Sequence, residues 1–330
     1  MKVAVELWKN GGMINHLISL EIAVGLSSHY DIPITMYNFG FNTMYNPLHR
    51  LGTGRNELIK NDIKNPIHLF DLLNWNSSGW DIVAQVPEEL NDYKKIEISK
   101  YYVDCDPSMD DNYYSSYKEL KLEKTSNYNF ISPVCFYSRT FKNRSQKIDM
   151  ALSEIKWKSE YLKLANKISK ELGDFSGMHL RSTDLNHTIF TVGDTDFLNG
   201  LSFLEEKSLP IVLSTDNTKS EIVLKNQSKY KIIDQVIMEN WYESFKALPN
   251  SGETVLGLLS NLVMGHSKNF IGTPGSTYTA YIQRCCNQRQ NNFEWNFFSG
   301  KYGTYHIQNT KKYGRFPRWW REFPESKLNM

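Results

Sequence analysis

The second half of the chain repeatedly changes from a short apolar segment to a polar loop and then to a helical pattern. Segments 175–182 (FSGMHLRS) and 209–217 (LPIVLSTDN) each contain an apolar run of strand length. A third strand is predicted over 231–237, and residues 254–265 (TVLGLLSNLVMG) have the length and composition of a buried helix. Residues 268–286 predict a strand, a tight loop and a further helix. This succession is typical of an α/β unit with a parallel sheet.

The chain also begins with an α/β pattern. Residues 2–8 predict a strand, a Gly-rich loop follows, and apolar residues at helical spacing predict a helix over 13–26. A second strand is predicted over 31–37, which completes a βαβ unit. The clearest helix is predicted over 145–172, with Gly173 as its stop.

Length and composition indicate a globular protein with more than one domain. The chain has 330 residues, 40% of them hydrophobic, and a net charge of +2 that does not by itself indicate a nucleic-acid binder. We predict an N-terminal Rossmann-like domain over 1–165 and a C-terminal Rossmann-like domain over 166–310. A basic, aromatic tail follows over 311–330.

Features that direct a chain into or across a membrane are not evident. No apolar run has the roughly 18 residues of a membrane span, and the N-terminus reads as a strand and not as a secretory signal. The four cysteines lack metal-site spacing, and Cys285 and Cys286 are adjacent. We therefore expect reduced cysteines and a cytoplasmic protein of bacterial or viral type.

Polar groups gather where the predicted strands end. Ligands of open α/β sheets bind beyond the carboxyl ends of the strands, so these groups are expected to line a cleft shared by both halves. They come from the loops KNGGMIN, HLRSTD, LSTDN and IGTPGSTYT. The first loop lacks the G-x-G-x-x-G spacing of a dinucleotide site, and it is either a plain turn or a loop that brings Asn15 and His16 to the cleft.

The loop GTPGSTYT can be interpreted in two ways. Gly272 and Gly275 permit tight backbone geometry, and Ser276 and Thr277 stand where a helix begins. A helix N-terminus with free N–H groups is an anion site. The alternative is an ordinary cap, in which Ser276 or Thr277 satisfies its own helix. No Gly-Lys-Ser/Thr follows, so the loop is not a Walker A motif.

Arg181 and His179 also have two readings each. Arginine presents a planar fork of donors that suits phosphate, but Asp184 or Asp216 could instead form a structural ion pair with Arg181. His179 has apolar neighbours, which is more typical of a histidine satisfied within the core than of a catalytic residue.

The motifs GMHLRSTD, IVLSTD and FIGTPGSTYTAYIQR, in this order, resemble the C-terminal motifs of the GDP-fucose-dependent fucosyltransferases. That family includes protein O-fucosyltransferases and α1,2- and α1,6-fucosyltransferases. NGGMINHLISLEIAVGLS is similar to the family's N-terminal loop and helix. The resemblance covers residues 1–35 and 175–285. It implies a GT-B architecture, in which two Rossmann-like domains face a cleft and no metal is required.

The resemblance also implies roles for individual residues. Arg181 would bind the donor pyrophosphate and stabilise the leaving nucleotide. The remaining donor-binding residues would be His179, Asp216, Gly272, Ser276, Thr277 and Tyr278, and the sugar or acceptor side would be formed by Gly11, Gly12, Asn15 and His16. Separately from the resemblance, a direct displacement needs a general base near the acceptor hydroxyl, for which we favour Asp184 over Glu6 and His187, unless Asp184 only forms the ion pair with Arg181.

The implied activity is that of a metal-independent inverting glycosyltransferase. It would transfer fucose or a related sugar from a nucleotide-diphosphate sugar to a hydroxyl on a glycan or protein. A GDP-sugar is the expected donor. Two alternatives stay open. The tail KKYGRFPRWWR interleaves cations with aromatics, a pattern that can bind phosphates and stack bases, so a phage-type enzyme that glycosylates hydroxylated DNA bases is one alternative, unless the tail packs on the fold. Ser182 stands where relatives have a second arginine, which leaves room for a non-catalytic nucleotide- or glycan-binding protein.

Overall fold

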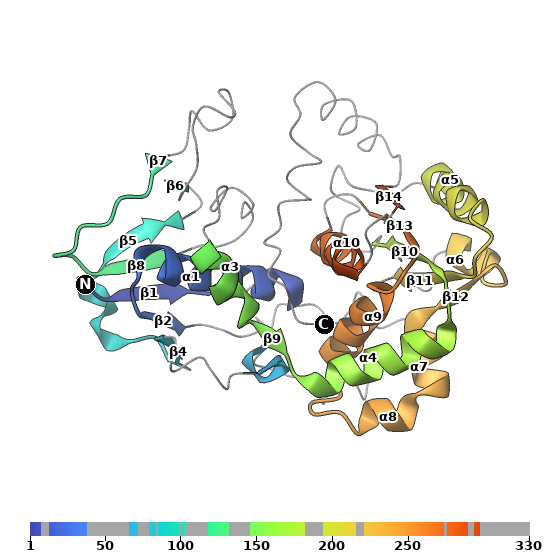
Figure 1. The fold of residues 1–330 in the computed structure, drawn as a ribbon, viewed down its shortest axis with the longest axis horizontal. Helices are drawn as coiled ribbons and strands as arrows, with labels where there is room; N and C mark the ends of the chain where they lie inside the picture. The colour runs from blue at the N-terminus through green and yellow to red at the C-terminus, as the bar shows by residue number, and fades with distance from the viewer. Residues whose placement is uncertain are drawn as a thin grey trace. The chain divides into compact units, whose positions relative to one another are not determined.

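The structure is a computed structural model that describes residues 1–7, 13–37, 66–71, 79–83, 85–98, 101–102, 118–131, 146–181, 194–215, 221–273, 276–289 and 294–297. These residues form two compact units, the first of which ends at Lys158 and the second of which begins at Ser159. Each unit is built around its own five-stranded sheet (Figure 1). The predicted domain limits, and the roles given to the domains, stay predictions.

The first unit contains a sheet in the order β4-β2-β1-β8-β5, and every pairing within it is parallel. Its strands are β1 (Val3–Glu6), β2 (Ile34–Tyr37), β4 (Trp80–Ile82), β5 (Lys94–Glu97) and β8 (Tyr128–Ile131). Shorter elements of this unit are η3 (Pro66–Leu69), β3 (Phe70–Asp71), η5 (Glu88–Asp92), β6 (Tyr101–Tyr102), β7 (Lys118–Glu119) and β9 (Lys156–Trp157). The predicted βαβ start is confirmed, because β1 and β2 pair in parallel on either side of one helix.

That helix is α1 (Met13–Tyr30), which is buried along almost its whole length, and it packs against α3 (Gln146–Ser153). The prediction of one helix over 145–172 is wrong, because β9 separates α3 from α4 (Ser159–Leu172). Ile155 and Trp157 are buried on either side of a half-exposed Lys156, which is the alternation of a strand. The Trp157 ring stacks on Phe70 with centroids 4.4 Å apart, so tertiary packing overrides the helical pattern. Gly173 does stop α4, with a φ of 70°.

The second unit contains a sheet in the order β12-β11-β10-β13-β14, again with every pairing parallel. Its strands are β10 (Ser176–Leu180), β11 (Ile211–Thr215), β12 (Tyr230–Ile232), β13 (Asn269–Gly272) and β14 (Glu294–Phe297). Its helices after α4 are α5 (Asp194–Glu205), α6 (Glu221–Lys225), α7 (Ile233–Asn240), α8 (Tyr242–Lys246), α9 (Glu253–Met264) and α10 (Thr277–Arg289). The predicted α/β class with parallel sheets is confirmed.

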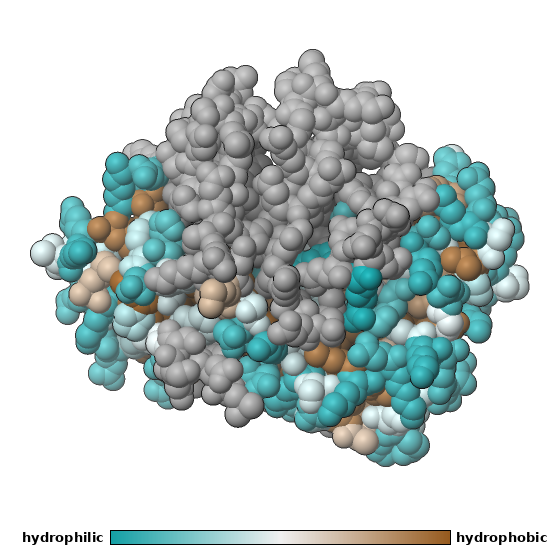
Figure 2. Space-filling view, viewed as in Figure 1, coloured by the Kyte–Doolittle hydropathy of each residue, from teal (hydrophilic) through white to brown (hydrophobic). Residues whose placement is uncertain are grey.

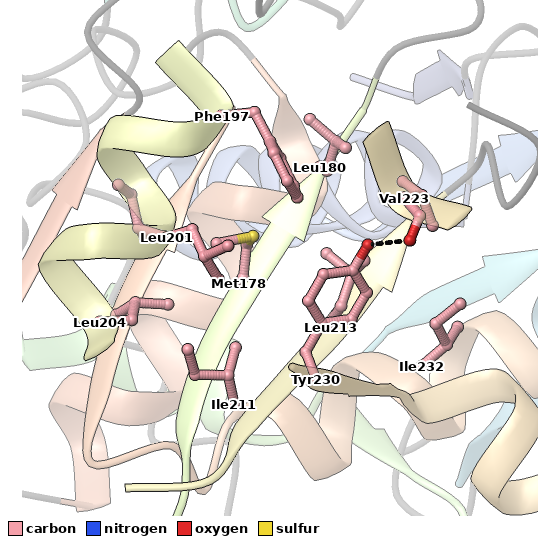
Figure 3. Packing of buried hydrophobic residues seen from close by; sticks show 11 residues of the cluster. Met178, Leu180, Phe197, Leu201, Leu204, Ile211, Leu213, Val223, Tyr230 and Ile232 are labelled. Atoms are coloured by element: carbon pink, nitrogen blue, oxygen red, sulfur yellow. Dashed lines mark hydrogen bonds between the residues drawn. The ribbon is translucent and has the colours of Figure 1, made fainter. Parts of the chain in front are cut away.

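One face of this second sheet carries a hydrophobic cluster, shown in Figure 3. Met178 and Leu180 of β10 point from the sheet toward Phe197 and Leu201 of α5. The cluster is completed by Leu204, Ile211, Leu213, Val223, Tyr230, Ile232 and Ile271. Within it, the Tyr230 hydroxyl donates to the Val223 carbonyl at 2.5 Å, so the one polar group of the cluster is satisfied.

The opposite face is covered closely by α9 and α10. Gly177 of β10 has no room for a side chain, because a Cβ there would lie 2.9 Å from Ser267 Cβ. Helix α9 also contacts α4 and α10, and Gly265 at its end leaves room for Cys285 of α10. Gly177 therefore lets the end of α9 approach the sheet, and Gly265 lets α9 and α10 approach each other.

The strand predicted over 231–237 is correct only at its start. Strand β12 ends at Ile232, and α7 begins at Ile233. The apolar residues Ile233 and Ile237 are four positions apart and both buried, which is helical spacing. A hydrogen bond from the Ser260 hydroxyl to the Asp234 carboxylate ties α7 to α9.

On the face drawn in Figure 2, the described surface is mostly hydrophilic, with hydrophobic residues scattered over it. Isolated exposed apolar side chains of this kind are usual and indicate no interface. Among the described helices, none has the length and apolar character needed to cross a membrane.

Candidate functional site

The order in which the chain adds strands to the second sheet reverses between β10 and β13. From β10 the chain moves outward to β11 and β12, and it then returns to the other side of β10 as β13. Ligands of open α/β sheets bind at such a switch point, beyond the carboxyl ends of the two strands. Here those ends are adjacent, since His179 of β10 is paired with Gly272 of β13. Arg181 follows the first of these ends and the start of α10 follows the second, so both lie at the same edge of the sheet.

Thr273 fastens the two strand ends together. Its backbone N–H donates to the His179 carbonyl at 3.0 Å, and its hydroxyl donates to the same carbonyl at 3.1 Å. The hydroxyl oxygen also accepts the backbone N–H of Arg181 at 2.9 Å. Thr273 is fully buried, so these bonds are shielded from water.

His179 links the strand end to helix α10. Its Nδ1 lies 2.7 Å from the Thr279 hydroxyl, and its ring lies nearly parallel to that of Tyr278 with centroids 6.2 Å apart. Burial, together with the positive charge of Arg181, lowers the pKa of His179 to about 3. The imidazole is therefore neutral at physiological pH and takes part in a buried hydrogen bond, as expected of a satisfied core histidine. A role in donor binding stays a prediction.

Gly272 is required by the close approach of α10. A Cβ at this position would lie 2.8 Å from Thr279 Oγ1 and 3.0 Å from Phe270 Cε1, and it would collide with the Thr279 methyl group. The absence of a side chain lets the first turn of α10 rest directly on the end of β13.

The hydroxyls at the start of α10 are buried, and they make no hydrogen bond to any residue that the structure describes. Ser276 is fully buried and immediately precedes the helix, while Thr277 is its first residue. Neither Ser276 Oγ nor Thr277 Oγ1 has a hydrogen-bond partner within the described part of the chain. An ordinary cap would have its side-chain oxygen bonded to a backbone N–H of the first turn. The capping reading of these residues is therefore not supported, and the hydroxyls are free to meet a ligand.

Arg181 is the first residue after β10 and is half-buried. Its charge lies near enough to the His179 ring to disfavour the protonated imidazole. Arg181, Ser276 and Thr277 thus lie around one switch point, and a cation, two hydroxyls and the N–H groups of a helix start suit an anion such as phosphate.

The remaining predicted residues fall elsewhere. Asn15 and His16 belong to the first turn of α1 in the other unit, where Asn15 is half-buried and His16 is completely buried. Gly11, Gly12, Asp184 and Asp216 lie outside the described residues. Ser182, His187 and the tail over 311–330 lie outside them as well.

Sequence reasoning missed Thr273 and Thr279. Both belong to the loop and helix that were singled out for their glycines and serine, yet their hydroxyls hold His179 and the Arg181 backbone. The available signal was the position of a hydroxyl residue directly after a strand at the switch point. Among the described residues, no group of three or more His, Cys, Asp or Glu side chains could hold a metal ion. Metal independence nevertheless stays a prediction.

Comparisons with known proteins return similarities of structure only. No protein-family model matches the sequence, and no curated protein matches it. The chain is similar to the crystal structure of POFUT1 in complex with GDP, with 11% identity, a TM-score of 0.49 and coverage of 91% of this chain and 98% of that one. The crystal structure of POFUT1 in complex with GDP-fucose has 11% identity and a TM-score of 0.49, with coverage of 91% of this chain and 99% of that one. The crystal structure of fucosyltransferase NodZ from Bradyrhizobium has 11% identity and a TM-score of 0.49, with coverage of 86% of this chain and 94% of that one. At these identities the similarity concerns the course of the chain and not the chemistry of a site.

Proposed function

We propose that this protein is a glycosyltransferase that uses a nucleotide-diphosphate sugar and binds the diphosphate at the start of α10. The observation that carries the proposal is the pair of buried hydroxyls, Ser276 Oγ and Thr277 Oγ1, without partners in the described residues. They stand beside the strand end from which Arg181 emerges. Buried hydroxyls that make no bond within the protein are costly, and a phosphate oxygen would satisfy them.

The donor follows from two separate arguments. The geometry favours a ligand with adjacent phosphates, because the helix start and Arg181 offer donors of two kinds near one another. The motif resemblance implies guanosine as the nucleoside and fucose or a related sugar as the group transferred. We therefore propose GDP-fucose as the first donor to test, with no metal required.

The proposed reaction is a single displacement with inversion. The acceptor hydroxyl oxygen forms a bond to C1 of the sugar, and the bond between C1 and the diphosphate oxygen breaks. The bonding electrons leave with the nucleoside diphosphate, where Arg181 and the α10 start stabilise the added negative charge. The acceptor proton passes to a general base, for which Asp184 is the candidate. Gly11, Gly12, Asn15 and His16 are the proposed sugar or acceptor side.

The acceptor is proposed only as a hydroxyl on a glycan or a protein, acted on inside the cell. The DNA-modifying alternative depends on the tail over 311–330, and the non-catalytic alternative depends on Ser182. Neither stretch belongs to the described residues, so no structural observation favours either alternative as a second candidate function.

The test is release of nucleoside diphosphate from GDP-fucose, alone and with glycan or peptide acceptors. Wild type is expected to release GDP, Arg181→Ala to lose at least about 100-fold in rate, and Arg181→Lys to recover only part of it, because lysine lacks the planar fork. Arg289→Ala is the matched control, since Arg289 is also half-buried but stands at the opposite end of α10. Equal rates for wild type and Arg181→Ala would show that the site has been assigned wrongly.

A further inference from the structure

We infer that Thr273 is a positioning residue for Arg181. The Thr273 hydroxyl fixes the backbone of Arg181 at the point where the chain leaves strand β10. The inference rests on the proposed function, because it assigns Thr273 to the same anion site. It is carried by the bonds of a single buried hydroxyl to two residues of the neighbouring strand end.

The Thr273 hydroxyl acts as donor and acceptor at once. It donates to the His179 carbonyl at 3.1 Å and accepts the Arg181 N–H at 2.9 Å. The His179 carbonyl also accepts the Thr273 backbone N–H at 3.0 Å, so this carbonyl keeps a partner if the hydroxyl is lost. The bond from the Arg181 N–H goes to the hydroxyl itself, so removal of the hydroxyl removes this bond directly.

The position of this bond explains why it matters for a ligand. Strand β10 ends at Leu180, so Arg181 is the first residue beyond the regular ladder. The bond to Thr273 extends the contact between β10 and β13 by one residue and fixes the backbone from which the Arg181 side chain departs. Helix α10 starts at Thr277, four residues after Thr273, and the N–H of Ser276 donates to the Thr273 carbonyl at 3.4 Å. Thr273 therefore couples the arginine to the helix start through one residue.

The surrounding contacts make this arrangement rigid. The Thr279 hydroxyl is hydrogen-bonded to the His179 ring, with 2.7 Å between Thr279 Oγ1 and His179 Nδ1. Thr273 thus bonds to the backbone at the end of β10, and Thr279 bonds to the side chain of His179. Correct spacing between a cation and a helix start within a fraction of an ångström is what a preorganised phosphate site requires.

The test uses Thr273→Val, which keeps the number of side-chain heavy atoms but removes the hydroxyl, and Thr273→Ser, which retains it. GDP affinity, measured by calorimetry, should fall about tenfold in Thr273→Val and stay within about threefold of wild type in Thr273→Ser. Turnover of GDP-fucose should fall in the same order. Thr35→Val, a change on β2 of the other unit, is the control and should leave both quantities unaltered. Unchanged affinity in Thr273→Val, or equal losses in the Val and Ser variants, would overturn the inference.

Amide hydrogen exchange separates this inference from the proposed function, because it needs no ligand. Exchange at the Arg181 N–H should speed up about tenfold in Thr273→Val and return to the wild-type rate in Thr273→Ser. If wild type binds no nucleoside diphosphate, the proposed function fails, and the exchange result still decides whether Thr273 holds Arg181. An Arg181 N–H that exchanges equally in all three proteins rejects the role of Thr273 even if GDP binds.

Discussion

His179 Nδ1 and the Thr279 hydroxyl lie 2.7 Å apart, in a buried bond that joins the end of β10 to the first turn of α10. This bond crosses the switch point of the second sheet, and it links the strand that leads to Arg181 with the helix whose start carries Ser276 and Thr277. The consequences of this link can be measured.

Removing the Thr279 hydroxyl should destabilise the fold. In Thr279→Val the buried Nδ1 of His179 loses its partner, and we expect the free energy of unfolding to fall by about 1–3 kcal/mol. Thr279→Ser should lose less, because the hydroxyl is kept. Urea denaturation of both variants, with Thr35→Val as the control, checks this. A Thr279→Val variant as stable as wild type would mean that the bond does not contribute to stability.

Stability should decrease as the pH falls below the ordinary pKa of histidine. Burial lowers the pKa of His179 to about 3 and that of His266 to about 4, each with help from a neighbouring arginine. Between these values and about 6.5 the unfolded chain binds protons that the folded chain does not. As the pH falls, the buried His179 therefore lowers the free energy of unfolding by up to about 1.4 kcal/mol per pH unit in that window, and the partly exposed His266 lowers it by less. Above pH 6.5 both contributions are constant.

Denaturation at several pH values tests that slope. His179→Gln keeps a polar side chain but cannot titrate, so its unfolding free energy should fall less steeply between pH 6.5 and pH 4 than that of wild type. A wild-type stability that is flat over this window contradicts the neutral, buried state of the two histidines.

Two glycine substitutions should separate crowding at the site from ordinary backbone strain. Gly272→Ala places a Cβ 2.8 Å from Thr279 Oγ1, so it should destabilise by about 1–3 kcal/mol and also weaken GDP binding by displacing the start of α10. Gly173→Ala has no atom within 4 Å of the new Cβ but keeps a φ of 70°, so it should cost about 1–2 kcal/mol of stability alone. Thermal melts and GDP titrations measure the two effects. Normal GDP affinity in Gly272→Ala would remove the link between this glycine and the site.

Ser276→Ala should weaken binding without lowering stability. A serine that caps a helix contributes about 0.5–2 kcal/mol. The Ser276 hydroxyl makes no bond in the described part of the chain, and an unbonded buried hydroxyl is costly, so its loss should not lower the free energy of unfolding and should raise it slightly. GDP affinity should nevertheless fall. A large loss of stability with unchanged affinity would identify Ser276 as an ordinary cap.

Much of the second unit could be predicted from its sequence, because buried parallel strands and their loops leave a strong local pattern. The strands around Met178, Leu213 and Phe270, and the helix that begins at Thr277, all lie where the apolar runs predicted them. The first strand, helix and second strand of the chain were also correct. These elements are buried in the core, and burial leaves a pattern of apolar residues that can be read from the sequence.

The errors arose where a distant contact decides the local structure. Residues 145–172 have a continuous helical pattern, but the stacking of Trp157 on Phe70 interrupts it with a short strand. Within the site, Arg181 and Ser276 could be singled out by chemistry alone. Thr273 and Thr279 could not, since their importance lies in bonds to residues more than 90 positions away.

The central claim is that the switch point of the second sheet binds a nucleoside diphosphate through Arg181 and the start of α10. A thermal-shift series with GDP, UDP, ADP and CMP, on wild type, Arg181→Ala and Arg289→Ala, tests it most directly. A ligand at about 100 times its Kd stabilises the folded state by about 2.7 kcal/mol, which raises Tm measurably. The account predicts that GDP raises the Tm of wild type and Arg289→Ala, and that Arg181→Ala loses most of the shift. A wild-type Tm that no nucleoside diphosphate raises, or a GDP shift that Arg181→Ala keeps in full, would contradict it.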